Sequence, residues 1–185
     1  MPDYDDAKPE GVMKVVLGAV LLFTVSCSVA TFSQDAVTAA MAACGPKDDH
    51  VKVDPNIGRD ASAQPESGKA LVYLVEDDGV TNGIVGAGIT LRVGLDGAWV
   101  GAVNHRNPFL SFLISPGERH LCVNWQSSIE SRSRLTRLAH MEAQPNRVYY
   151  FRVRRWDTSY QMFLDFDPID SDLGKFLLVS LSAKK

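Results

Sequence analysis

Short apolar runs separated by turn residues occupy this chain from Lys69 to its C-terminal end. Runs of this kind, bounded by Gly, Pro, Asn, Asp and Ser, are typical of β-strands. Eight or nine strands at this spacing predict an all-β domain over 69–185. We expect an antiparallel β-sandwich, immunoglobulin-like or related, with a small barrel as the alternative. The predicted strands are 71–75, 89–95, 98–102, 109–114, 119–125, 135–143, 147–155, 160–166 and 175–182.

Two places carry the clearest strand signals. Asp96-Gly97 stands between two β-prone runs, and an Asp-Gly pair in that position favours a two-residue hairpin. The run 119–125 alternates between apolar and polar residues, which indicates a half-buried strand. Its two sides are Leu121, Val123 and Trp125 against His120, Cys122 and Asn124.

Residues 13–30 have the composition of an export signal. Lys14 provides a positive charge before an apolar run over 15–23. Ser28-Val29-Ala30 then places small residues at the minus-three and minus-one positions of a cleavage site. The sequence therefore predicts an exported protein, either periplasmic or extracellular.

Three details of this segment bear on its processing. The first twelve residues carry four acids where a basic leader is expected, so we expect translation to start at Met13. A lipoprotein signal would be processed at Cys27 and tie the protein to a membrane, although Thr24 stands where Leu is usual. A retained membrane helix would need about twenty apolar residues, and this run is shorter. The predicted organisation has a signal segment over 1–30, with a lipid anchor and a retained helix as alternatives.

Cleavage after Ala30 sets the size and charge of the mature chain. The whole chain has 185 residues and a net charge of −3, and the removed segment carries four acids and two bases. The mature chain then has 155 residues, which suits one domain, and a net charge of −1. Near-neutral charge argues against nucleic acid or an anionic membrane as a partner.

The same cleavage reduces the number of cysteines in the mature chain from three to two. Cys27 leaves with the signal, and Cys44 and Cys122 remain as an even pair in an oxidising compartment. A disulfide between them would close a loop of nearly eighty residues and contribute about 4 kcal/mol of stability on a chain-entropy estimate. Two buried free thiols are the alternative.

The segment 31–68 is predicted to hold one short helix and an irregular tether. Residues 35–44 combine good helix formers with an acidic start, and Gly45-Pro46 follows as a stop. Residues 45–68 are polar and interrupted by Pro and Gly, which is typical of irregular structure.

Several motifs occur in a characteristic order along the mature chain. They are Cys44-Gly45-Pro46, Gly68-Lys69-Ala70-Leu71-Val72-Tyr73, Val93-Gly94-Leu95-Asp96-Gly97-Ala98-Trp99-Val100-Gly101, Ser115-Pro116-Gly117-Glu118-Arg119-His120-Leu121 and Val148-Tyr149-Tyr150-Phe151-Arg152. In this order the chain resembles bacterial exported proteins of the family catalogued as domain of unknown function 2846. The Leu-Asp-Gly hairpin and the Pro-Gly-Glu-Arg-His turn also resemble the carbohydrate-associated β-modules called PEGA domains. The resemblance implies a β-sandwich envelope protein and transfers no catalytic residue.

Four aspartates near the C-terminal end form a weak candidate calcium site. Calcium prefers several carboxylate and carbonyl oxygens on a tight loop. The alternative is a charged turn between two strands, with Pro168 and Gly174 as breakers. The candidate ligands are Asp165, Asp167, Asp170 and Asp172.

The run 147–156 mixes bases with aromatic residues. Alternation places Tyr149, Phe151 and Val153 inward and leaves the other side chains on an outer face. An exported protein does not meet nucleic acid, so we expect this face to contact an acidic partner or a glycan. The predicted ligand face is Arg147, Tyr150, Arg152 and Arg154.

The remaining motifs favour a protein without catalysis. The four histidines show no paired spacing of the kind that zinc sites use, and a site of His120 with Cys122 would lose its thiol to the disulfide. No Gly-x-Ser-x-Gly or His-Glu-x-x-His sequence occurs, so we predict no catalytic residue and no cofactor. Trp99 could stack on a sugar, but burial in the core is the commoner role for such a residue.

The sequence thus predicts an exported, non-enzymatic β-sandwich that acts as an envelope-associated binding or structural module. Its partner would be an envelope protein or a cell-surface glycan. A small secreted enzyme such as a hydrolase and an assembly subunit with exposed edge strands are the alternatives.

Overall fold

The structure is a computed structural model, and it describes residues 38, 42–56, 58, 60–77, 89–129, 132, 135–157 and 161–183. All of them belong to one compact unit, Phe32–Lys185. Within these residues no helix is long and apolar enough to cross a bilayer.

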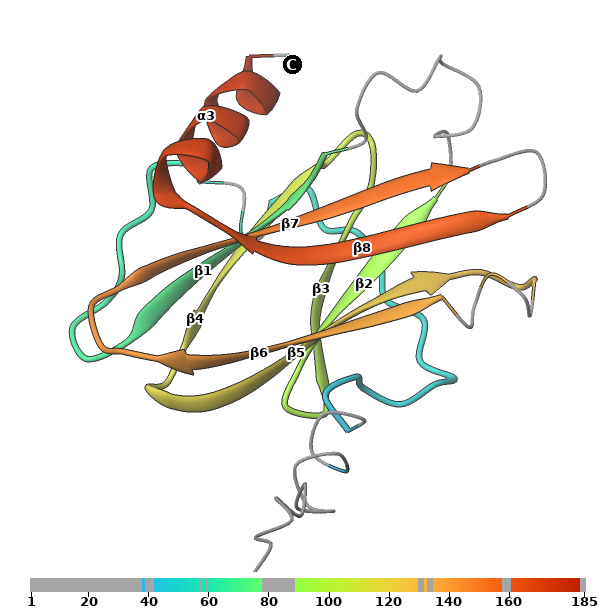
Figure 1. Cartoon of the computed structure of the whole chain (residues 1–185), viewed down its shortest axis with the longest axis horizontal. Coiled ribbons are helices and arrows are strands. Elements are labelled where there is room, and N and C mark those ends of the chain that lie inside the picture. Colours follow the sequence, from blue (N-terminus) through green and yellow to red (C-terminus); the bar gives the residue numbers. More distant parts are fainter. Residues whose placement is uncertain are drawn as a thin grey trace, which may run out of the picture. The chain divides into compact units, whose positions relative to one another are not determined.

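Eight strands form two sheets of four, which confirms the predicted all-β sandwich (Figure 1). The first sheet has the order β4 (Phe109–Ile114), β1 (Ala70–Glu76), β7 (Val148–Asp157), β8 (Met162–Ile169). The second sheet has the order β3 (Ala98–Val103), β2 (Thr90–Leu95), β5 (Gly117–Gln126), β6 (Thr136–Ala143). All neighbouring strands pair antiparallel except β1 and β7, which are parallel.

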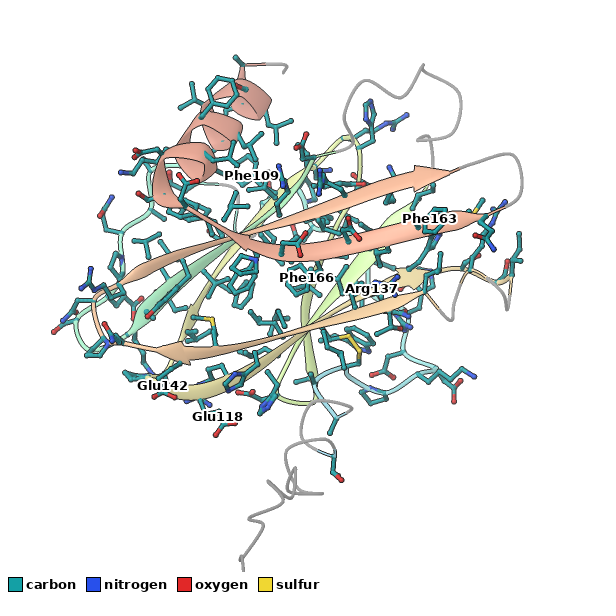
Figure 2. The ribbon with its side chains drawn as sticks, in the orientation of Figure 1. Phe109, Glu118, Arg137, Glu142, Phe163 and Phe166 are labelled. Atoms are coloured by element: carbon teal, nitrogen blue, oxygen red, sulfur yellow. A yellow bond between two sulfur atoms is a disulfide. The ribbon has the colours of Figure 1, made fainter. Side chains whose placement is uncertain are left out.

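The core lies between the two sheets, where one face of each strand is apolar. The predicted alternation of β5 is confirmed, because Leu121, Val123 and Trp125 are buried in this core. Phe151 and Phe166 of the first sheet belong to the same core, and the centroids of these two rings are 5.3 Å apart. Phe166 is labelled in Figure 2. Since side chains alternate along a strand, the other face of β5 points out of the sandwich and is free to carry polar groups.

The hairpin between β2 and β3 is also confirmed. Asp96 and Gly97 have φ angles of 48° and 91°, so both central residues are left-handed. That geometry is the one that joins two antiparallel strands with the natural sheet twist, and Asp-Gly adopts it at low cost.

The helix of the described residues is C-terminal, whereas the sequence predicted an N-terminal one. α3 (Ser171–Ser182) replaces the strand expected over 175–182. It begins at Asp170, whose carboxylate accepts hydrogen bonds from the backbone N–H groups of Asp172 and Leu173. This capping satisfies donors that a helix start leaves unpaired. Of the predicted helix over 35–44, most residues lie outside the described part of the chain.

Helix α3 covers the outer face of the first sheet. Leu177 and Leu178 pack against Tyr73, Tyr150 and neighbouring apolar residues in a second, smaller core. Gly174 lies so close to the ring of Tyr150 that a Cβ there would overlap it. A glycine at this position therefore lets the helix approach the sheet.

One ion pair lies inside the sandwich. Arg155 Nη2 is 3.0 Å from Glu76 Oε1, and the two side chains are 9% and 1% exposed. The guanidinium of Arg155 also lies 5.9 Å from the ring centroid of Trp125. Removing one partner of such a pair leaves a buried charge uncompensated, which is strongly destabilising.

Candidate functional site

An N-terminal segment crosses the outer face of the second sheet. We call residues 42–51 the strap. Cys44 in the strap is bonded to Cys122 in β5, with the two Cα atoms 5.2 Å apart, so the predicted disulfide is confirmed. The strap approaches β2 closely at Gly94, where a Cβ would lie 2.7 Å from the carbonyl oxygen of Ala43. Glycine at that position permits this contact.

Arg92 on β2 holds the middle of the strap. Its side chain is buried, and Nη1 donates hydrogen bonds to the carbonyl oxygens of Lys47, at 3.1 Å, and Asp49. Nε donates to Oδ1 of Asn124 at 3.1 Å. The guanidinium of Arg92 therefore makes hydrogen bonds to the strap and to the sheet at the same time. Burial lowers the pKa of Arg92, and the nearby charge of Asp49 opposes that effect. Arg92 remains cationic at neutral pH because an Arg pKa is ordinarily far above 7.

Trp99 on β3 lies under the strap and not in the core between the sheets. Its indole Nε1 donates a hydrogen bond to the carbonyl oxygen of Pro46 at 2.9 Å. The guanidinium carbon of Arg92 lies 4.3 Å from the ring centroid, within the range of a cation–π contact. Trp99 is therefore an anchor for the strap, and the predicted burial in the core is wrong. It also lines the groove described below, so stacking on a sugar stays a prediction.

Gln126, at the end of β5, fixes the far end of the strap. Its Oε1 accepts from the backbone N–H of Val51 at 2.7 Å, and its Nε2 donates to the carbonyl oxygen of the same residue at 3.1 Å. The amide nitrogen also lies 3.1 Å from Nε2 of His50. Covalent and hydrogen bonds thus hold the strap at both ends and at its centre.

A groove of about 710 Å³ opens between the strap and the sheet. This volume falls within the range of small-molecule binding sites. The wall formed by the strap is charged, and the wall formed by the strand ends carries hydroxyl and amide groups. The residues that line these two walls include Asp48, Asp49, His50, Ser127, Ser128 and Thr136.

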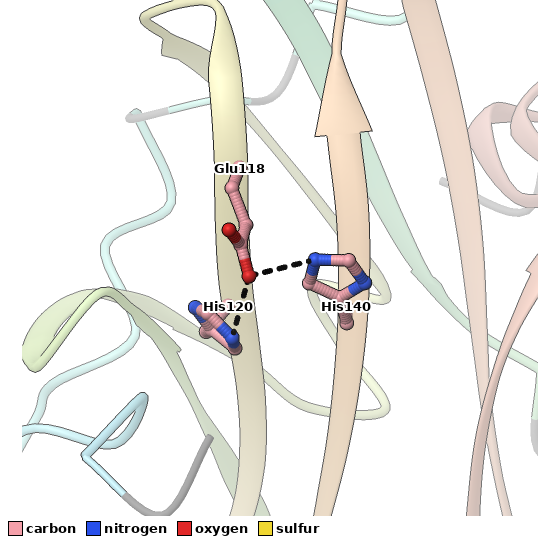
Figure 3. A group of neighbouring side chains, drawn as sticks. All are labelled: Glu118, His120 and His140. Atoms are coloured by element: carbon pink, nitrogen blue, oxygen red, sulfur yellow. Dashed lines mark ion pairs between the residues drawn. The ribbon is translucent and has the colours of Figure 1, made fainter. Parts of the chain in front are cut away.

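A separate cluster lies further along the same outer face. His120 on β5 and His140 on β6 are direct cross-strand partners, and Glu118 precedes His120 on the same side of β5. Glu118 Oε1 lies 3.7 Å from His120 Nε2 and 3.2 Å from His140 Nε2 (Figure 3). In the described part of the chain, this is the group of ligand-type side chains close enough to share one metal ion.

This cluster was missed in the sequence because its two histidines are far apart along the chain. Spacing rules for zinc detect ligands on one helix or one turn. Here the pairing register of β5 and β6 brings the ligands together, and a one-residue shift would move one histidine to the other face. Only a prediction of the pairing register of the two strands, with His120 opposite His140, would have revealed the cluster.

The four aspartates proposed for calcium are not arranged on one loop. Asp165 and Asp167 belong to β8, where Asp165 lies 3.6 Å from the guanidinium of Arg154. Asp170 caps α3, and Asp172 stands in the first turn of that helix. The pKa of Asp170 is lowered chiefly because it accepts a hydrogen bond from the backbone of Leu173. Its carboxylate therefore has a structural role.

The predicted ligand face on β7 is interrupted. Tyr150 is 8% exposed and stacks on Tyr73 beneath α3, with ring centroids 5.5 Å apart, so it is not part of an open face. Arg152 lies 3.9 Å from Asp77, Arg154 is paired as described, and only Arg147 is classed as exposed among the four. The physical reason is twofold: the C-terminal helix covers Tyr150, and carboxylates pair with Arg152 and Arg154.

Comparisons with known families and with curated proteins give no match. The resemblance to the exported family stays a prediction, as does export itself.

Proposed function

We propose that this protein is an exported, non-enzymatic binding module that holds a cell-surface glycan fragment in the groove beside the strap. The observation that carries the proposal is the groove itself, a space of about 710 Å³ whose strap wall is fixed by a disulfide. A fixed wall supports binding because less conformational freedom is lost when a ligand enters.

The disulfide supports the exported location. Disulfides form and persist in oxidising compartments and are rare in the cytosol. Cys44 and Cys122 join a segment near the N-terminal end to the centre of the second sheet, so the bridge belongs to the architecture of the site. An exported protein would meet the glycans of the cell surface.

The lining of the groove supports a sugar as the ligand. Asp48 and Asp49 offer carboxylate oxygens that accept hydrogen bonds from sugar hydroxyl groups. Ser127 and Ser128, which also line the groove, can both donate and accept. Arg92 on the floor is already engaged by two strap carbonyls and Asn124, so it is less suited to a strongly anionic ligand.

The test is a titration of the oxidised, isotope-labelled protein with single glycans, followed by backbone amide NMR. Chito-oligosaccharide, β-glucan oligosaccharide and galactan oligosaccharide are suitable probes. We expect one of them to shift the amide signals of residues 47–50 and 126–128. Asp48→Ala should weaken its binding roughly tenfold or more, since hydrogen bonds to charged groups are the stronger ones.

Asp167→Ala is the matched control, because Asp167 is an exposed carboxylate on β8 in the other sheet. It should bind as the parent protein does. The proposal fails if none of the glycans moves the groove signals, or if Asp48→Ala and the parent bind the same glycan equally well.

A further inference from the structure

Three side chains on the second sheet converge on one point in space. Both imidazole Nε2 atoms face the same carboxylate oxygen, Glu118 Oε1, at 3.7 Å for His120 and 3.2 Å for His140 (Figure 3). The rings are tilted by 44° with centroids 5.2 Å apart, so they are not stacked face to face. Their nitrogen atoms can therefore point at a shared partner.

We propose that Glu118, His120 and His140 form a binding site for a divalent transition metal ion, with Zn²⁺ as the expected ion. Tetrahedral zinc with ligand bonds near 2.0–2.2 Å holds its ligand atoms roughly 3.4 Å apart. The two measured separations bracket that value, and all three ligand atoms lie within 4.8 Å of one another. Small side-chain rotations suffice to complete the coordination.

The composition of the cluster selects the class of metal. Two imidazoles and one carboxylate are a ligand set that zinc accepts in proteins. Calcium and magnesium prefer oxygen ligands alone, so two nitrogen ligands disfavour them. The site is therefore distinct in chemistry from the aspartates first considered for calcium.

The backbone around the cluster is held firmly, which reduces the cost of ordering the ligands. The backbone N–H of His120 donates to Asp96 Oδ1 at 2.8 Å. Asp96 also pairs with Arg119, with Nη1 and Oδ2 2.9 Å apart. Cys122, two residues further along β5, is tied to the strap. The three ligands thus stand on a rigid sheet, as a precise metal site requires.

The site is open to solvent on one side. The side chains of Glu118 and His140 are 60% and 57% exposed, and that of His120 is 14% exposed. Glu142 stands opposite Glu118 in the ladder and is exposed at the same end of the strand pair (Figure 2). A water molecule would supply the fourth ligand at this open side, because Glu142 is not in the group whose ligand atoms lie within 4.8 Å of one another.

This arrangement places the metal between β5 and β6. Binding would join two neighbouring strands through side chains, in addition to their backbone hydrogen bonds. An ion that binds the folded chain and not the unfolded one raises the unfolding temperature, and a tighter-binding ion raises it more. The proposal does not depend on the glycan groove, which lies further along the same face.

The experiment is a calorimetric titration of the full, oxidised chain with ZnCl₂ after treatment with a chelator. The chain carries Cys27→Ser so that no free thiol competes for the metal. We expect saturation at one equivalent of Zn²⁺. Titration with Co²⁺ should give visible d–d absorption bands of a tetrahedral site, and Zn²⁺ should abolish them by displacement.

Two variants identify the ligands. His140→Ala and Glu118→Gln replace exposed side chains and should fold normally. Each should weaken Zn²⁺ binding at least about 10–100-fold, since loss of even an outer-shell partner has that effect. His105→Ala is the matched control, because His105 is an exposed histidine in the turn after β3, and it should leave the affinity unchanged.

Three results would overturn the proposal. One is the absence of saturable binding to the parent chain. Another is undiminished binding to His140→Ala and Glu118→Gln. The third is an equal loss of affinity in His105→Ala, which would indicate unspecific association with surface histidines.

Discussion

Removal of the Cys44–Cys122 bridge gives the most direct test of how the strap is held. The perturbation is the double variant Cys44→Ala with Cys122→Ala. Cys122 is fully buried, so alanine is preferable to serine, whose hydroxyl would need a hydrogen-bond partner in the interior. We expect the fold to persist, because Arg92, Trp99 and Gln126 still bind the strap.

The magnitude follows from the sequence separation of 78 residues between the two cysteines. In the chain-entropy relation, closing a loop of that length costs the unfolded chain about 15 cal/mol/K, which is about 4.5 kcal/mol at 25 °C. The free energy of unfolding should fall by about this amount when the bridge is removed. With a urea slope of roughly 2 kcal/mol/M, the unfolding midpoint should fall by roughly 2 M.

The assay is urea unfolding followed by tryptophan fluorescence, with and without a reducing agent. Reductant should lower the midpoint of the parent protein to that of the variant, and it should leave the variant unchanged. The reduced parent keeps both sulfur atoms, so this comparison separates the effect of the bridge from that of a small cavity. Cys27→Ala is the control and should unfold as the parent does.

A midpoint shift below about 0.5 M would refute this reasoning. Such a result would mean that the bridge hardly restricts the unfolded chain, or that the strap detaches before the sandwich unfolds. Hydrogen exchange at the Val51 amide distinguishes these two outcomes, since its bond to Gln126 is lost only when the strap detaches.

Three further predictions concern the first sheet and its helix. Glu76→Gln should lower the free energy of unfolding by about 3–5 kcal/mol in thermal or urea unfolding, because it removes the carboxylate charge that pairs with Arg155 inside the sandwich. Gly174→Ala should lower it by about 1–3 kcal/mol in the same measurements, because the new methyl group overlaps the ring of Tyr150. The pKa of Asp170 is lowered in the folded state, so its stabilising effect is present above the ordinary value of 3.8 and is lost as the pH falls through the folded pKa. Asp170→Asn keeps the cap, because Asn also caps helices, but it carries no titrating group. The free energy of unfolding of this variant should therefore decrease less than that of the parent between about pH 5 and pH 2.

The substitutions at Glu76 and Gly174 each have a control. Asp165→Asn breaks a partly exposed pair with Arg154 and should cost about 1 kcal/mol or less. Lys175→Ala changes an exposed helix residue beside Gly174 and should be nearly neutral. Equal losses for Glu76→Gln and Asp165→Asn, or a neutral Gly174→Ala, would contradict the structural explanations. So would an Asp170→Asn variant with the parent's pH dependence.

The strands were predictable because their signals are local. Asp96-Gly97 specifies its own hairpin, and the alternation in β5 is visible within one run of residues. The error at the C-terminal end also has a local cause. The run Phe176-Leu177-Leu178-Val179 has the β-prone composition of a strand, but Asp170 caps the segment and its buried leucines share one helix face. Asp170 fits a calcium loop as well as a helix cap in the sequence, so the sequence does not reveal where the helix starts.

The candidate sites were less predictable because they depend on contacts between distant segments. Nothing in a polar, Pro-containing tether indicates that it will lie across a sheet, and Arg92 gives no sign of its three partners until the strap is in place. Likewise, His120 and His140 become neighbours only through the register of β5 with β6. The disulfide could be predicted from the sequence, but the groove beside the strap that it holds could not.

The parallel pairing of β1 with β7 has a consequence for how the chain folds. Every residue of β1 is buried, and Leu71 is aligned with Val148. Strand β1 is therefore synthesised long before its partner β7, with which it must pair. Contacts between such distant segments slow folding. Until β7 is available, one edge of an almost wholly apolar strand has no partner, and unpaired apolar edges promote aggregation. Aggregation should therefore be most pronounced in chains truncated before β7, even though the disulfide and the whole second sheet would still be present in them.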